Sequence, residues 1–257
     1  MPAVNVVHAQ EVEPFVSSDG GLSVRVTLGP RTDFDALQQA VLECPPGRRG
    51  SISVPGDVEE TLFVLEGEGR LRVGAEARTV GPDMGIYLPP GSAVELENTG
   101  GGPLRLVAVR VPDPSPGPPS PVHVCRLDDQ HVEQATTERA FRIVADPSTG
   151  LRSATHFVGY IPAERAPDHF HTYDEVIYVL DGEGLMEAGA FSRPVAAGSC
   201  IQLPARTVHC LSNAGDGPMR IAAVFRPAGS PAAAFHPDGT PAYQSNQDPL
   251  QRRSQRP

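Results

Sequence analysis

Short runs of apolar and β-branched residues, separated by glycine- and proline-containing turns, dominate the chain. The runs 61–65 and 176–180 are each followed by a Gly-x-Gly turn, and proline-rich turns precede later apolar runs. Runs of this length bounded by turn residues are typical of β-strands. The pattern predicts an antiparallel β-sandwich or barrel built from many short strands.

The strand pattern occurs twice at a constant spacing. The sequence ETLFVLEGEG at 60–69 aligns with EVIYVLDGEG at 175–184, an offset of 115 residues. The same offset carries Ile86 onto Ile201, Leu88 onto Leu203, Pro89 onto Pro204 and Asn98 onto Asn213. Self-similarity at a fixed period indicates repeated structural units. We therefore expect two copies of one all-β domain.

Composition along the chain suggests where these copies divide. A proline-rich stretch at 112–121 favours stiff, extended geometry and is expected to be a linker. We expect an N-terminal domain at 1–111 and a C-terminal domain at 122–235. The remaining residues, 236–257, form a polar tail without apolar periodicity.

One segment is ambiguous by propensity alone. Residues 34–43 have a fair helix propensity. It occupies the place of 153–160 in the second copy, whose Thr, His, Phe and Val content favours a strand. We therefore predict a strand in both copies.

Charge and residue usage narrow the classes of function. The chain has 257 residues and a formal net charge of -10, which disfavours nucleic acid and membrane partners. It contains no lysine, which excludes lysine Schiff-base chemistry and the phosphate-binding P-loop.

The four cysteines form no C-x-x-C pair and are expected to be free thiols. The N-terminal residues lack a basic segment followed by an apolar run, so we expect a cytoplasmic protein.

The second copy contains the residues with the clearest chemistry. His169 and His171 are two positions apart, so on an extended strand their side chains point to the same face. Glu175 follows four residues later, and His209 lies on the far side of the next hairpin. Three imidazoles and a carboxylate suit Fe, Mn, Ni, Co, Cu or Zn better than Ca or Mg. These four residues are predicted to bind one divalent transition metal.

These residues resemble the two motifs of the cupin family, G-x5-H-x-H-x3,4-E-x6-G and G-x5-P-x-G-x2-H-x3-N. The matched positions are His169, His171, Glu175, Gly182, Gly198, Pro204, His209 and Asn213. Ala163 and Arg206 stand where the motifs have glycine. The resemblance covers both copies and implies a bicupin, with two tandem jelly-roll β-barrels and the metal in the second.

The first copy keeps the framework but not the ligands. The offset places Val54, Gly56, Glu60 and Val94 at the four ligand positions. One carboxylate does not hold a transition metal, so we expect one metal ion per chain. A scaffolding, dimerising or ligand-shaping role is expected for the N-terminal domain.

Other residues near the motifs are weaker candidates. Arg206 could meet an anionic substrate at the barrel rim, with a solvated surface arginine as the alternative. His156 could line the pocket or face outward, because its strand parity is not settled by sequence. Asp168 and Asp174 flank the ligands and could orient the imidazoles.

The resemblance implies several activities. A dioxygenase-type oxidoreductase acting on a small carbonyl, phenolic or enol-acid substrate is expected first, with iron as its metal. The layout is also similar to ureidoglycine aminohydrolases, which are metal-dependent hydrolases, although their ligand pattern differs. A non-catalytic metal or small-molecule binding module is the third possibility. In each case we expect a small-molecule ligand and a homodimer.

Overall fold

Nearly all of the regular structure is β. The computed structural model of the protein describes residues 3–118, 120–136, 139–163 and 165–242. Within them the only helices are three short 3-10 turns, η1 (Ala9–Glu11), η2 (Pro30–Thr32) and η3 (Leu127–Asp129). No helix in this part of the chain has the length and apolar character needed to cross a membrane. The all-β prediction is confirmed.

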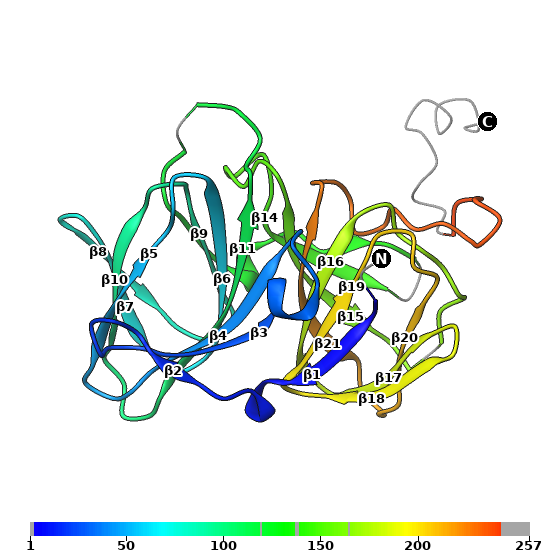
Figure 1. The fold of residues 1–257 in the computed structure, drawn as a ribbon, viewed down its shortest axis with the longest axis horizontal. Coiled ribbons are helices and arrows are strands. Elements are labelled where there is room, and N and C mark those ends of the chain that lie inside the picture. Colours follow the sequence, from blue (N-terminus) through cyan, green and yellow to red (C-terminus); the bar gives the residue numbers. More distant parts are fainter. Residues whose placement is uncertain (1–2, 119, 137–138, 164, 243–257) are drawn as a thin grey trace.

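Two β-barrels lie side by side, one from each half of the chain (Figure 1). Each barrel has one seven-stranded sheet and one smaller sheet, and every strand pair is antiparallel. The seven-stranded sheet of the first barrel runs, in spatial order, β12 (His123–Arg126), β9 (Met84–Leu88), β6 (Val58–Glu66), β11 (Leu104–Pro112), β4 (Gln38–Cys44), β3 (Ser23–Leu28) and β2 (Phe15–Val16). Its four-stranded sheet runs β5 (Arg49–Ser53), β10 (Ala93–Asn98), β7 (Gly69–Val73) and β8 (Glu76–Val80).

The second barrel repeats this arrangement, as expected for two tandem jelly rolls. Its seven-stranded sheet runs β1 (Asn5–His8), β19 (Ser199–Leu203), β16 (Asp174–Asp181), β21 (Met219–Arg226), β15 (Thr155–Ile161), β14 (Ala140–Ala145) and β13 (Glu133–Gln134). Its three-stranded sheet runs β18 (Phe191–Ala196), β17 (Glu183–Ala188) and β20 (Cys210–Asn213). The segment that was ambiguous by propensity, 34–43, is a strand from residue 38 on, within β4, and its counterpart in the second copy lies in β15. Residues 34–37 lie before the strand.

Strand alternation separates the barrel interiors from the contact between the barrels. On β16, Ile177 and Val179 belong to the core of the second barrel, whereas Val176 packs against residues of the first. On β6, Leu62 and Val64 face the first barrel interior, and Phe63 faces the second half of the chain. The two large sheets therefore pack face to face between two separate barrel cores.

Each half also contributes one edge strand to the other half's sheet. The β1 strand pairs with β19, and the β12 strand pairs with β9. In Figure 1, β1 is the blue strand that lies against the yellow strand of the second barrel. The division at 1–111 and 122–235, drawn from composition and repeat spacing, does not anticipate this exchange. Sheet membership at residues 5–8 and 123–126 is decided by tertiary pairing.

Candidate metal centre

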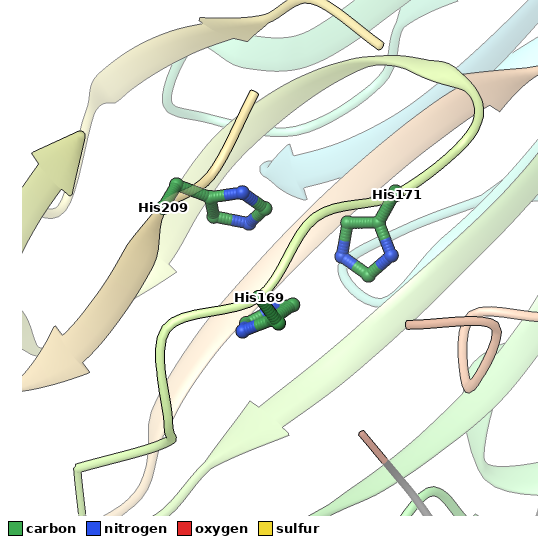
Figure 2. A group of neighbouring side chains, drawn as sticks. All are labelled: His169, His171 and His209. Atoms are coloured by element: carbon green, nitrogen blue, oxygen red, sulfur yellow. The ribbon is translucent and has the colours of Figure 1, made fainter. Parts of the chain in front are cut away.

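Three histidines from two separate segments meet at one end of the second barrel. His169 and His171 lie just before β16, and His209 lies just before β20. The backbones of His169 and His209 hydrogen bond to each other, with N···O distances of 3.1 and 2.8 Å. One ligand atom from each of the three side chains lies within 4.8 Å of the others. Figure 2 shows the three rings gathered around a common space.

Backbone carbonyls fix the orientation of all three rings. The Nδ1 atoms of His169, His171 and His209 lie 2.9 Å from the carbonyl oxygens of Pro167, Ala233 and Thr207, respectively. A carbonyl accepts but does not donate, so each Nδ1 carries the proton and each Nε2 keeps its lone pair. Imidazoles held in this way are typical metal ligands. This donor set fits a divalent transition-metal ion.

Burial keeps the imidazoles neutral. It lowers the pKa of His171 to about 3 and the pKa of His209 well below its usual value. It also lowers the pKa of His169, and the guanidinium of Arg139 adds to that effect. Neutral imidazole is the form that binds a metal, so protons do not compete for these sites near neutral pH.

The predicted fourth ligand, Glu175, is buried on β16 and lines the same cavity. It is not a member of the close group formed by the three histidines. Burial raises the pKa of its carboxyl to about 8. The structure therefore brings three of the four predicted ligands together and places Glu175 in the wall of the same cavity.

The cavity at the histidines is small and mostly apolar. It has a volume of about 90 Å³, about three times the share of one water molecule in the liquid, roughly 30 Å³. Its apolar walls include Phe141, Phe157, Ile161, Ile177, Leu211 and Ile221. Arg139 is its one lining side chain with a permanent positive charge among the described residues.

Sequence analysis did not single out Arg139. The residue precedes β14 and lies 30 positions before His169, outside both motifs. Its Nη2 atom donates to the carbonyl of Leu211 at 3.4 Å, which holds the guanidinium at the cavity. No sequence signal available in a single chain distinguishes it from other arginines.

Arg206, one of the two substrate candidates, does not line this cavity. Its side chain is exposed, and its backbone N–H donates to the carbonyl of His171 at 2.7 Å. Its φ of 63° is in the left-handed region, and Gly91 has a φ of 76° at the equivalent turn of the first barrel. The backbone therefore adopts the glycine conformation of the motif with an arginine present.

His156, the other substrate candidate, lies between the barrels and not in the pocket. Its neighbour Phe157 faces the second barrel core, so the alternation of β15 turns His156 toward the first barrel. The Nδ1 atom lies 2.7 Å from Oγ1 of Thr61, and burial lowers the pKa of the ring to about 3. The suggestion that it lines the site or faces solvent is wrong.

The flanking aspartates form their hydrogen bonds with the surrounding loops. Asp168 is exposed and forms an ion pair with Arg165 at 2.9 Å. Asp174 accepts a hydrogen bond from the backbone N–H of Ala205 at 2.9 Å, which fixes the turn before His209. The predicted role in orienting imidazoles belongs instead to the three backbone carbonyls.

The first barrel has no equivalent histidine group among the residues that the structure describes. Val54 and Val94 are buried in its apolar core. Glu60 is buried, and its carboxylate accepts a hydrogen bond from Nε of Arg110 at 3.1 Å. An ion pair thus occupies the position that Glu175 has in the second barrel.

Comparison with known proteins agrees with this architecture. The chain is similar over 87% of its length to a glyoxylate-induced protein of Pseudomonas aeruginosa (20% identity, 89% of that chain, TM-score 0.74). It is similar over 88% to the protein Ylba of E. coli (11% identity, 91% of that chain, TM-score 0.74). A mutant oxalate decarboxylase of Bacillus subtilis matches over 87% of this chain (14% identity, 77% of that chain, TM-score 0.71).

Sequence comparison gives one further relative and the family. An uncharacterized protein of Methanocaldococcus jannaschii is 27% identical over 104 residues, which cover 40% of this chain and 82% of the relative. The model of the cupin domain matches twice, at residues 40–110 and 156–225. Together with the two barrels and the histidine group in the second, these matches show that the chain belongs to the cupin family and is a two-domain cupin.

Proposed function

We propose that the protein is a mononuclear metal-dependent enzyme whose second barrel transforms a small carboxylate, with dioxygenase-type oxidation as the first reaction. The observation that supports this most directly is the set of three imidazoles whose Nε2 atoms remain available beside a cavity containing Arg139. His169, His171 and His209 would hold the ion, with Glu175 as the fourth ligand. A bound divalent ion supplies Lewis acidity and, when redox-active, electron transfer.

The cavity favours a small anionic substrate. A space of about 90 Å³ suits a molecule of few atoms, and apolar walls exclude bulk water from it. The guanidinium of Arg139 is a suitable partner for a carboxylate because it presents several N–H donors in one plane. A small keto-acid or enol-acid therefore suits the site better than a phenol. The names of two structural neighbours refer to oxalate and glyoxylate, which are small carboxylates of this kind.

Glu175 favours a second reaction, non-oxidative decarboxylation. A buried carboxyl group with a pKa of about 8 keeps its proton at neutral pH. When a substrate carboxylate leaves as CO2, its bonding electron pair stays on the remaining carbon, and Glu175 can supply the proton to that carbon. In this reaction Glu175 is a general acid rather than a metal ligand.

Elemental analysis and product assays test the proposal. The full chain is loaded with Fe(II) or Mn(II) and incubated with oxalate, glyoxylate or pyruvate, while O2 uptake and CO2 release are followed. We expect one ion per chain and O2 uptake. CO2 release without O2 uptake supports the second reaction. Ammonia release from ureidoglycine, or ligand binding without turnover, contradicts both reactions.

Three substitutions separate the roles of the residues. His171→Ala should remove most of the bound metal and the activity. Arg139→Gln should retain the metal and raise KM, because it removes the charge that faces the substrate carboxylate. Arg206→Gln is the matched control, since Arg206 is exposed and lies outside the cavity. An unchanged KM for Arg139→Gln would contradict the substrate assignment.

A further inference from the structure

The first barrel contains a cavity much larger than the one at the histidines, and its lining extends to the exposed residue Phe15. Its volume is about 440 Å³, compared with about 90 Å³ in the second barrel. Cavities of this size, lined mainly by apolar side chains and a few polar groups, are typical small-molecule sites. The two cavities lie at equivalent places in the two barrels. Glu60 lines the cavity of the first barrel, and Glu175, at the equivalent position, lines the cavity of the second.

The difference in size follows from the side chains at equivalent positions. Val26 and Leu42 line the first cavity, whereas Phe141 and Phe157 line the second at the same offset of 115 residues. The two aliphatic side chains occupy less volume than the two aromatic ones, so more space is left in the cavity of the first barrel. Where the second cavity has the cationic side chain of Arg139, the first has the apolar side chain of Val24.

The charged groups of this cavity form a single ion pair, and uncharged polar residues, among them Gln38 and Ser53, also line it. The Nε atom of Arg110 donates to Glu60 at 3.1 Å, and the Nη2 atom donates to the carbonyl of Ser53 at 3.1 Å. Both charged side chains line the cavity. The described residues provide no hydrogen bond to Nη1 of Arg110 or to the second oxygen of Glu60. The cavity therefore offers a donor and an acceptor side by side, with a net charge of zero.

We propose that the first barrel is a second, metal-free binding site for a neutral molecule with a short apolar body and a head group that both donates and accepts hydrogen bonds, such as a primary amide. The head group would accept from Nη1 of Arg110 and donate to the carboxylate of Glu60. The apolar body would contact Val24, Val26 and Leu42. A charged head group is disfavoured because one member of the ion pair, the buried Glu60 or the partly exposed Arg110, would repel it. This site is independent of the function proposed for the second barrel.

Titration calorimetry on the full, metal-loaded chain tests this site, with hexanamide as the probe and hexanoate as its charged counterpart. We expect saturable binding of one hexanamide per chain and affinity for hexanoate weaker by at least about tenfold. Absence of saturable hexanamide binding, or equal or tighter binding of hexanoate, would overturn the proposal.

Variants locate the binding. Val26→Phe introduces the side chain of the second barrel into the first and should weaken hexanamide binding by at least about tenfold while the metal content stays at the wild-type level. Ala108→Val, which also narrows the cavity, is used if Val26→Phe does not fold. His171→Ala is the matched control in the other barrel and should bind hexanamide normally. If a folded cavity-filling variant binds hexanamide with wild-type affinity, the probe binds outside the cavity of the first barrel and the assignment is overturned.

Discussion

Glu60 and Glu175 occupy the same position in the two barrels but have different neighbours. Across the sheet, Glu60 is opposite Arg110, and Glu175 is opposite Phe225. Phe225 stacks on Tyr173 with ring centroids 3.9 Å apart, so an aromatic pair in place of a cation lies opposite Glu175 in the sheet. Burial raises the pKa of both carboxyl groups, but Arg110 opposes the rise at Glu60, whereas no cation opposes it at Glu175, whose pKa is raised to about 8.

The first residue-scale prediction concerns the protons released by metal binding. At pH 7 the three imidazoles are already neutral because burial lowers each pKa, whereas Glu175, with a pKa of about 8, is mostly protonated. If Glu175 is the fourth ligand, Zn²⁺ binding at pH 7 should release about one proton, measured with an indicator dye in weak buffer. Glu175→Gln should abolish the release. No release from the wild type would exclude Glu175 from the ligand set.

The second residue-scale prediction concerns Arg206. A left-handed backbone conformation costs a non-glycine residue roughly 1–2 kcal/mol, partly offset by the greater freedom of glycine in the unfolded chain. Arg206→Gly should therefore raise the free energy of unfolding by up to about 1 kcal/mol and leave metal content unchanged. Arg206→Ala keeps the backbone cost and is the control. A loss of stability in the glycine variant, measured by urea unfolding, would show that the arginine side chain contributes a contact.

At the scale of elements, buried polar groups connect the two barrels. Glu59 on β6 is fully buried, and its carboxylate accepts hydrogen bonds from the backbone N–H groups of Arg152 and Ser153 at 2.9 and 3.1 Å. The hydroxyl of Tyr87 donates to the same carboxylate at 3.2 Å. Glu59, a residue of the first barrel, thus provides the hydrogen-bond acceptor for two backbone N–H groups that lie just before β15 in the second barrel.

Glu59→Gln should destabilise this connection. The substitution places an amide NH2 among groups that only donate, so at least one buried donor loses its acceptor. The expected loss in free energy of unfolding is about 1–3 kcal/mol, measured by urea unfolding. Glu76→Gln, at a glutamate whose side chain is 74% exposed, is the control and should change stability little. A stability equal to wild type would mean that water replaces the lost acceptor.

At the scale of the whole molecule, a buried histidine makes the contact between barrels sensitive to acid. His156 is buried with its Nδ1 atom 2.7 Å from Oγ1 of Thr61, whose hydroxyl donates to the carbonyl of Ile86 at 3.2 Å. The Nδ1 atom of the ring therefore donates, and burial keeps the ring neutral. Its pKa is lowered to about 3 in the folded protein, against 6.5 for a free imidazole.

Between pH 6.5 and about 3 the unfolded chain binds a proton at His156 that the folded chain does not. The stability contributed by this group is therefore present above pH 6.5 and falls on acidification, by about 1.4 kcal/mol per pH unit. His156→Gln retains a donor to Thr61 without titrating. Urea unfolding between pH 6 and 4 should show a smaller loss of stability in the variant. Equal pH dependence in the two proteins would contradict the assignment.

The predicted homodimer is also a property of the whole molecule. Light scattering at micromolar concentration should give twice the mass of the chain. A mass equal to that of one chain would contradict the prediction.

The linear sequence determined the repeated all-β architecture, the histidine group and the loss of ligands from the first barrel. These features follow from local patterns, because alternation, turn residues and a constant offset are all read along the chain. Tertiary structure decided which residues meet. It placed Arg139 at the cavity and turned His156 toward Thr61.

Tertiary pairing also exchanged β1 and β12 between the sheets and set Phe225 opposite Glu175. A one-residue change in strand parity moves a side chain from the core to the contact between barrels, and a single sequence does not resolve that parity. The surroundings of a buried charge likewise depend on residues distant in the chain. For this reason Glu60 and Glu175, alike in the two motifs, differ in chemistry.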